Sequence, residues 1–193
     1  MEAHRQAFES APQVIWLSDG GRGFWQVYST CFAHCAVAVL DFYHAAGHLA
    51  RATQAMFGES HSAQAKAWFR RWRHLLRHGR TRDVLRALTG LLNSGLFSGV
   101  AFTTLVQVQA YFQRHYQHMQ YQQFAQQKIP LGSGMVESAY KWLIQQRFKG
   151  VGMRWSEDRF NHLVQLRLAW ANQRFDTLFP NVPRPPSLAS PKR

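Results

Sequence analysis

The stretch "PQVIWLSDGGRGFWQVYSTCFAHCAVAVLDF", residues 12–42, contains two short apolar runs on either side of a helical pattern. The first run ends at Asp19 and two glycines, and the second ends at Asp41. Short apolar runs bounded by turn residues are typical of buried strands. The segment between them predicts a helix, because apolar residues recur at helical spacing at Phe24, Val27, Tyr28 and Cys31.

A second amphipathic pattern, "FYHAAGHLARATQAMF", follows Asp41 directly. We expect Asp41 to cap this helix, because a carboxylate accepts hydrogen bonds from the first free backbone amides. Residues 1–57 therefore predict the order strand, helix, strand, helix, which is typical of an α/β sheet. Polar residues that follow parallel strands lie along one edge of such a sheet, where we expect Asp19 and Asp41.

From about residue 60 to 127 the pattern is helical throughout. We expect one basic, amphipathic helix from Lys66 to Leu88, with an apolar stripe at Trp68, Phe69, Trp72, Leu75 and Leu76. Its other face carries Arg70, Arg71, Arg73 and Arg77. Such a face could be solvated, could lie on a membrane surface, or could contact the DNA backbone.

The segment "IPLGSGMVESAYKWLIQQRFKGVGMRW", residues 129–155, predicts a helix that begins near Ser133. Ser133 is a candidate cap, and Glu137 lies one turn inside, where the helix dipole favours an ionised carboxylate. A last helix is expected after Ser156, and the Pro-rich, basic residues 180–193 predict a disordered tail.

Charge indicates the class of partner. The 193 residues include 23 Lys and Arg against 10 Asp and Glu, a formal net charge of +13, so a polyanion such as DNA is the expected partner. No apolar run approaches the roughly 20 residues that span a bilayer, and the start lacks a signal sequence. We therefore expect a cytoplasmic protein with no membrane partner. Expected DNA contacts are Arg70, Arg71, Arg73, Lys141, Arg147, Lys149, Arg154 and Trp155, the last by stacking on a base.

Three carboxylates stand beside structural breaks: Asp19, Asp41 and Glu137. Phosphodiester chemistry by two metal ions needs acidic oxygen ligands that converge from separate elements. Each residue also has a purely structural interpretation. Asp19 can be a turn residue, Asp41 a helix cap, and Glu137 the partner of Lys141 four residues later.

A zinc site is the competing metal interpretation. Cys31, Cys35, His44 and His48 have the spacings Cys-x3-Cys and His-x3-His. A strand between the two pairs would hold them apart, so we expect no zinc and two reduced cysteines.

Residues 111–155, "YFQRHYQHMQYQQFAQQKIPLGSGMVESAYKWLIQQRFKGVGMRW", resemble the closing catalytic segment of bacterial insertion-sequence transposases of the DDE class. The similar group is the ISKra type, which is related to the Mutator-like elements. "LSDGGRGFW" resembles the stretch around that family's second catalytic Asp, and "LDFYHAAGHL" resembles its Asp-x-x-His motif. The resemblance extends from about Val14 to Phe179.

This resemblance implies a predominantly helical α/β protein with the second half of an RNase H-like core at residues 1–57. Residues 58–128 would be a helical insertion, and 129–179 would hold the Glu-bearing helix and the closing helix. Asp19 and Glu137 would bind Mg²⁺ or Mn²⁺ with carboxylates within about 10 Å. Asp41 and His44 would form a motif beside that site. The implied activity is cleavage and strand transfer at transposon ends.

The sequence also departs from the family pattern. The first catalytic Asp would lie upstream, yet no Asp precedes Asp19, and Gly47 stands where an acidic residue is common. We therefore expect a carboxyl-terminal fragment that is inactive alone and that pairs with itself or with an intact transposase. The alternative is a non-catalytic, basic DNA-binding protein or a regulator of an intact transposase.

Overall fold

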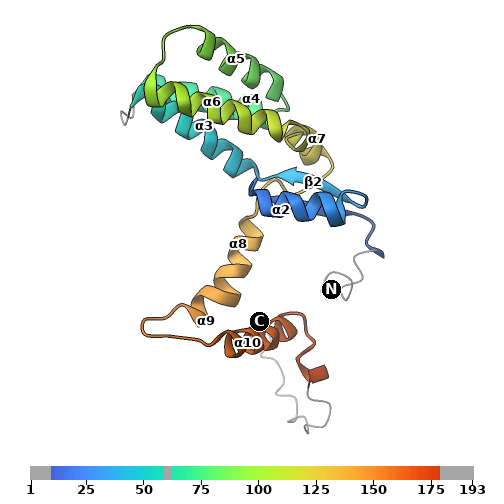
Figure 1. The fold of residues 1–193 in the computed structure, drawn as a ribbon. Helices are drawn as coiled ribbons and strands as arrows, with labels where there is room; N and C mark the ends of the chain where they lie inside the picture. Colours follow the sequence, from blue (N-terminus) through green and yellow to red (C-terminus); the bar gives the residue numbers. More distant parts are fainter. Residues whose placement is uncertain (1–9, 59–61, 179–193) are drawn as a thin grey trace, which may run out of the picture. The chain divides into compact units, whose positions relative to one another are not determined.

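The computed structural model describes residues 10–58 and 62–178, which are mostly helical and include a two-stranded parallel sheet (Figure 1). The chain divides into two compact units, Met1–Ser133 and Gly134–Arg193. We call these the first and second units. The predicted tail, 180–193, lies outside the described residues.

The sheet pairs β1 (Val14–Ser18) with β2 (Ala36–Leu40) in parallel, with Ser18 opposite Leu40. Helix α2 (Arg22–Val27) continues as a π-helical turn, Tyr28–Phe32, and connects the strands. Aromatic side chains hold this connection against the sheet, because Trp16 of β1 stacks on Phe32 with ring centroids 5.1 Å apart. The predicted order of strand, helix, strand is confirmed.

The rest of the first unit is helical, as predicted. Its elements are α3 (Phe42–Phe57), α4 (Ala63–Arg77), α5 (Thr81–Asn93), α6 (Gly99–Arg114), a 3₁₀ turn (Tyr116–His118) and α7 (Tyr121–Gln126).

The single helix predicted from Lys66 to Leu88 is wrong, because the chain breaks between α4 and α5. Gly79 has φ of 68°, a conformation that glycine adopts at little cost. The amide of Gly79 donates to the carbonyl of Leu76 and the amide of Arg80 to that of Leu75, at 3.2 and 2.9 Å. This pair of bonds is the Schellman motif, which ends helices at a left-handed glycine.

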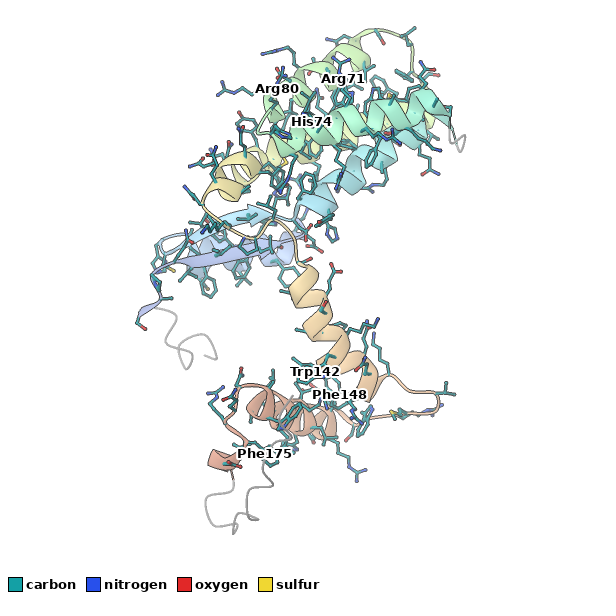
Figure 2. The ribbon with its side chains drawn as sticks, turned by 180° about the vertical axis from the view of Figure 1, so that it is seen from behind. Arg71, His74, Arg80, Trp142, Phe148 and Phe175 are labelled. Carbon is teal, nitrogen blue, oxygen red and sulfur yellow. The ribbon has the colours of Figure 1, made fainter. Side chains whose placement is uncertain are left out.

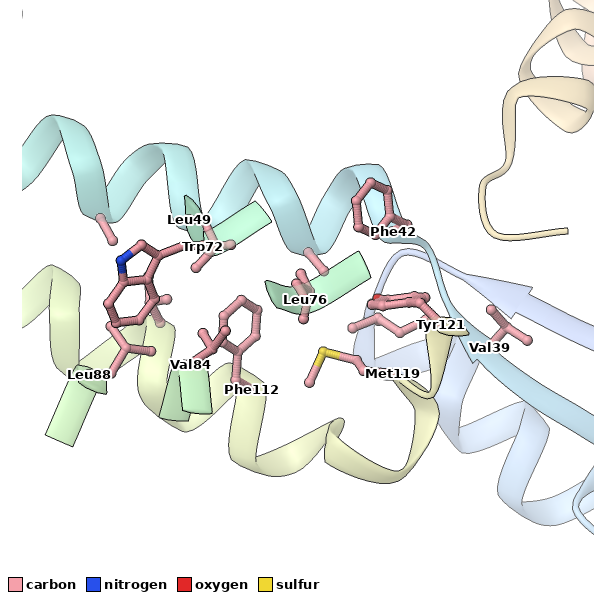
Figure 3. Packing of buried hydrophobic residues seen from close by; sticks show 14 of the residues in the cluster. Val39, Phe42, Leu49, Trp72, Leu76, Val84, Leu88, Phe112, Met119 and Tyr121 are labelled. Carbon is pink, nitrogen blue, oxygen red and sulfur yellow. The ribbon is translucent and has the colours of Figure 1, made fainter. Parts of the chain in front are cut away.

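One hydrophobic core joins the sheet to the helices of the first unit. Figure 3 shows its side chains pointing toward one another from several elements. Fully buried members come from β2, α3, α4, α5, α6 and α7, namely Leu40, Leu49, Leu76, Leu88, Phe112 and Tyr121. The segment expected as an insertion, 58–128, therefore shares its core with residues 36–52 and has no separate one.

The apolar stripe predicted for α4 is confirmed. Trp72 and Leu76 are buried, and Trp68, Phe69 and Leu75 pack against the core while partly exposed. The four predicted arginines of the opposite face are all exposed: Arg70, Arg71, Arg73 and Arg77.

The second unit consists of α8 (Gly134–Tyr140), a π-helical turn (Lys141–Gln145), α9 (Gln146–Phe148), α10 (Glu157–Ala171) and a 3₁₀ turn (Phe175–Leu178). The predicted cap is confirmed, because the hydroxyl of Ser156 accepts from the amide of Arg159 at 3.4 Å. Of its described hydrophobic side chains, Phe148 is the buried one. Large apolar groups stay exposed at Val136, Tyr140, Trp142, Val151, Met153, Trp155 and Trp170.

We predict that Phe112→Ala lowers the free energy of unfolding by about 3–5 kcal/mol, because it removes a fully buried ring from the shared core. Phe102 lies on the same helix with 41% of its surface exposed, so Phe102→Ala should cost about 1 kcal/mol or less. Urea unfolding of the two variants measures the difference. Equal losses would contradict the assignment of the core.

Candidate functional site

Asp19 directly follows β1 and is exposed. Its Oδ1 accepts a hydrogen bond from the amide of Gly21 at 2.9 Å. Asp19 therefore stabilises the turn, in agreement with its interpretation as a turn residue. The hydroxyl of Tyr111, on α6, donates to the carbonyl oxygen of Asp19 at 3.1 Å. A residue 92 positions away thus holds this turn in place, and the carboxylate remains accessible.

Gly20 is required in this turn for two reasons. Its φ is 91°, which a side-chain-bearing residue rarely adopts. A Cβ at this position would also lie 2.7 Å from the hydroxyl oxygen of Tyr111. The hydrogen bond from Tyr111 to Asp19 therefore depends on the glycine between them.

Asp41 directly follows β2 and is buried, with 1% of its surface exposed. Its Oδ1 accepts from the amides of Tyr43 and His44 at 2.7 and 3.2 Å, which confirms the predicted helix cap. Its Oδ2 accepts from the amide and the hydroxyl of Ser133, both at 2.6 Å. Ser133, predicted as the cap of the helix that carries Glu137, thus uses its hydroxyl hydrogen to bind Asp41.

The four hydrogen bonds keep Asp41 ionised. Burial alone would raise the pKa of this carboxyl, but the bonds from Ser133, His44 and Tyr43 outweigh burial and hold the pKa below its usual value. A buried carboxylate that accepts four hydrogen bonds favours a structural role. His44 has an exposed side chain, with Nδ1 3.9 Å from Oδ1 of Asp41.

The ring of His48 stacks on Tyr111 with centroids 3.6 Å apart and an interplanar angle of 14°. Burial, followed by the charge of Arg51, lowers the pKa of His48 to about 4, so its imidazole is neutral at pH 7. Burial, with Asp19 and Asp41, raises the pKa of Tyr111. Its hydroxyl therefore keeps the proton that it donates to Asp19.

A cavity of about 320 Å³ lies beside this turn, lined by Gly20, Arg22, Trp25, Gln26, Arg114 and His115. We call it the Arg22–Arg114 cavity. His115 is 3% exposed, and burial lowers its pKa to about 4. Trp25 Nε1 and His115 Nε2 are buried without a hydrogen-bond partner in the protein.

A second, larger cavity of about 640 Å³ lies between α4 and α5. Trp68 and Trp72, on its wall, stack with centroids 4.3 Å apart. Arg71, a predicted DNA contact, lines this cavity with Arg80 (Figure 2). Arg86 also lines it and donates to Asp83 at 3.0 Å. The cavity therefore combines guanidinium groups with the partly exposed ring of Trp68.

The other two predicted DNA contacts on α4, Arg70 and Arg73, have separate surroundings. Arg70 is exposed, and the guanidinium of Arg73 lies 5.2 Å from the ring centroid of Phe42. That distance is within the range of cation–π attraction.

In the second unit, Glu137 is exposed in the first turn of α8. Lys149 places its ammonium 5.8 Å from the ring of Tyr140, and Lys141, Arg147 and Arg154 are exposed. Asp19 belongs to the first unit and Glu137 to the second. Their predicted proximity stays a prediction.

Trp155 has a packing role in this unit. Its Nε1 donates to the carbonyl of Phe148 at 3.2 Å, and its ring meets that of Phe148 edge-on at 5.4 Å (Phe148 is labelled in Figure 2). Trp155 is 39% exposed, and a nucleic-acid base could contact this exposed part of the side chain.

In the described segments, 10–58 and 62–178, no group of three or more His, Cys, Asp or Glu side chains could hold a metal ion. Cys31 and Cys35 are exposed free thiols. No helix in these segments has the length and apolar character to cross a membrane.

No protein-family model matches this chain, and neither a curated protein nor a solved structure is significantly similar to it. The likeness to DDE transposases therefore depends on the sequence motifs alone.

We predict that Gly20→Ala disrupts the turn at Asp19, because the new methyl group would meet Tyr111 and the backbone would be strained. We expect a loss of about 1–3 kcal/mol in the free energy of unfolding. Gly23→Ala is the matched control, since nothing lies within 4 Å of a Cβ there. Helix propensity should make Gly23→Ala neutral or slightly stabilising. Equal effects in thermal unfolding would refute the proposed need for glycine.

We predict that the first unit loses stability as the pH falls from about 6.5 to about 4. The folded pKa values of His48 and His115 are about 4, below the ordinary value of 6.5, so the unfolded chain binds more protons in this window. Urea unfolding at several pH values measures the slope. His48→Gln should flatten it, whereas His34→Gln, at an exposed position, should leave it unchanged.

Proposed function

We propose that this chain acts on DNA as part of a DDE-type transposase with an RNase H-like core. The observation that carries the proposal is Asp19, an accessible carboxylate directly after the first of two parallel strands. Ligands of α/β proteins bind at this edge of the sheet, beyond the carboxyl ends of the strands. Tyr111 holds the backbone of Asp19 from α6, so the position of the carboxylate is defined before any ligand arrives.

The motifs assign Asp19 and Glu137 as ligands of Mg²⁺ or Mn²⁺. Glu137 suits this role because its side chain is exposed in the first turn of α8. Divalent cations held there would activate water or a DNA 3′-hydroxyl for attack on a phosphodiester. This class uses three acids, and the motifs locate two in this chain. Because the third acid has no counterpart among these motifs, we expect that residues 1–193 alone do not cleave DNA.

The positive residues would hold DNA in this scheme. The chain has a formal net charge of +13, and Arg70, Arg71, Arg147 and Arg154 are exposed. Contacts to phosphates fix the position of DNA without reading its sequence. These contacts need no metal, so they equally favour the second candidate, a non-catalytic DNA-binding protein or a regulator of an intact transposase. Metal binding at Asp19 separates the two candidates.

We predict that the protein binds duplex DNA with an affinity that falls steeply as salt increases, because phosphate contacts release counterions. The triple variant Arg70→Gln, Arg71→Gln, Arg73→Gln should lower the slope of log affinity against log salt by up to about 3. Arg51→Gln, Lys128→Gln, Arg159→Gln removes the same charge at exposed positions outside α4 and is the control. Salt-independent binding would contradict a DNA function of either kind.

The assignment of Asp19 and Glu137 as metal ligands is tested with the same purified protein and Mn²⁺. Calorimetry should show Mn²⁺ binding that Asp19→Asn and Glu137→Gln weaken and that Glu157→Gln, in the first turn of α10, leaves unchanged. DNA affinity in chelator should be the same for all three variants. DNA binding without such Mn²⁺ binding favours the non-catalytic candidate. Cleavage by residues 1–193 that Glu137→Gln abolishes would show that no third acid from outside is needed.

A further inference from the structure

The Arg22–Arg114 cavity is suited to an anion by its charges. Arg22, at the start of α2, and Arg114, at the end of α6, reach it from separate elements, and none of its six lining residues is acidic. The carboxyl end of α6 contributes about half of one negative charge nearby. Asp19 precedes Gly20 without lining the cavity, and it adds one negative charge nearby against the two guanidiniums. The two guanidinium groups therefore dominate the charge at the cavity wall.

A further side chain of the wall is also a hydrogen-bond donor. Gln26 adds an amide that can donate to an oxygen. Two guanidiniums and one amide thus line the same cavity. An oxygen-rich anion can accept hydrogen bonds from all three groups, whereas an apolar ligand can accept none.

We propose that the Arg22–Arg114 cavity binds a phosphate group whose oxygens Arg22 and Arg114 contact. Arginine suits this task because its planar fork forms two parallel hydrogen bonds to a phosphate. The volume of about 320 Å³ is at the lower end for ligand cavities, so it accommodates one phosphate with part of a nucleotide rather than a duplex.

The phosphate of a DNA strand is the source that the position favours, because the cavity begins at Gly20, the residue after Asp19. A strand held there would bring its neighbouring phosphodiester toward the Asp19 carboxylate. This identification of the source depends on the proposed function. The phosphate chemistry of the cavity does not depend on it.

Titration with inorganic phosphate tests the cavity itself. Calorimetry of the full chain at constant ionic strength, with chloride as the balancing anion, should show one saturable site. Arg22→Gln, Arg114→Gln should weaken it about tenfold or more, because two charge-assisted contacts are lost. The control, Arg86→Gln, Arg159→Gln, removes the same charge at exposed positions outside the cavity and should change the affinity less than about twofold.

All four substituted arginines are exposed, and circular dichroism checks that each variant is folded. Absence of saturable phosphate binding, or equal weakening in both double variants, would overturn the proposal. Gln26→Met is a further variant that keeps the length of the side chain and removes the amide donor. It should weaken phosphate binding without altering the fold.

Oligonucleotides then identify the source of the phosphate. A single strand with a 5′-phosphate and the same strand without it are bound to the wild type and to the Arg22→Gln, Arg114→Gln variant. A preference for the 5′-phosphate that the variant loses indicates a terminal monoester, and equal weakening of both strands indicates a phosphodiester. If the double variant weakens the binding of inorganic phosphate but of neither strand, the cavity binds free phosphate and the assignment of DNA as the source is overturned. If the wild type binds no DNA but still binds phosphate, the proposed function fails and the cavity assignment stands.

Discussion

The arrangement of the first unit depends on the carboxylate of Asp41. One of its oxygens caps the first turn of α3, and the other binds both the amide and the hydroxyl of Ser133, the last residue of the unit. The amide of Asp41 also continues the sheet by donating to the carbonyl of Ser18 at 2.8 Å. One buried side chain thus joins the end of β2, the start of α3 and the segment that leads into α8. Hydrogen bonds maintain its ionised form, since they lower the pKa, mainly through Ser133, against the effect of burial.

The two aspartates that follow neighbouring strands have opposite surroundings. Asp41 is buried and accepts four hydrogen bonds, whereas Asp19 is exposed, with Oδ1 bonded to Gly21. A saturated carboxylate stabilises the fold, and an accessible one is available for a ligand. At this edge of the sheet, the two environments therefore indicate a structural role for Asp41 and leave Asp19 available to bind a ligand. Arg22 and Arg114 line the cavity that includes Gly20, the residue after Asp19.

Much of this fold follows from local sequence patterns. The two strands, the cap at Asp41, the cap at Ser156 and the buried stripe of α4 were all predictable, because short apolar runs and helical periodicity reflect local geometry. The break at Gly79 was also readable in principle, since glycine before a new helical pattern is a common end signal. Contacts across the chain were not predictable. No periodicity links Tyr111 to Asp19, or Ser133 to Asp41, and the pairing of His48 with Tyr111 depends on how α3 packs on α6. The Arg22–Arg114 cavity was missed for the same reason, because its wall combines residues 20–26 with residues 114–115.

These long-range contacts have a consequence for how the protein is made. The bonds from Tyr111 to Asp19 and from Ser133 to Asp41 each close a loop of 92 residues. Closing such loops lowers the conformational entropy of the chain before any stabilising contact has formed. This entropy loss slows folding. During synthesis the strands emerge long before the residues that complete their surroundings. Until α6 and Ser133 have left the ribosome, the backbone around Asp19 and the carboxylate of Asp41 lack these partners. The edge of the sheet is therefore assembled late, and a nascent chain would depend on protection of its exposed strands until synthesis passes residue 133.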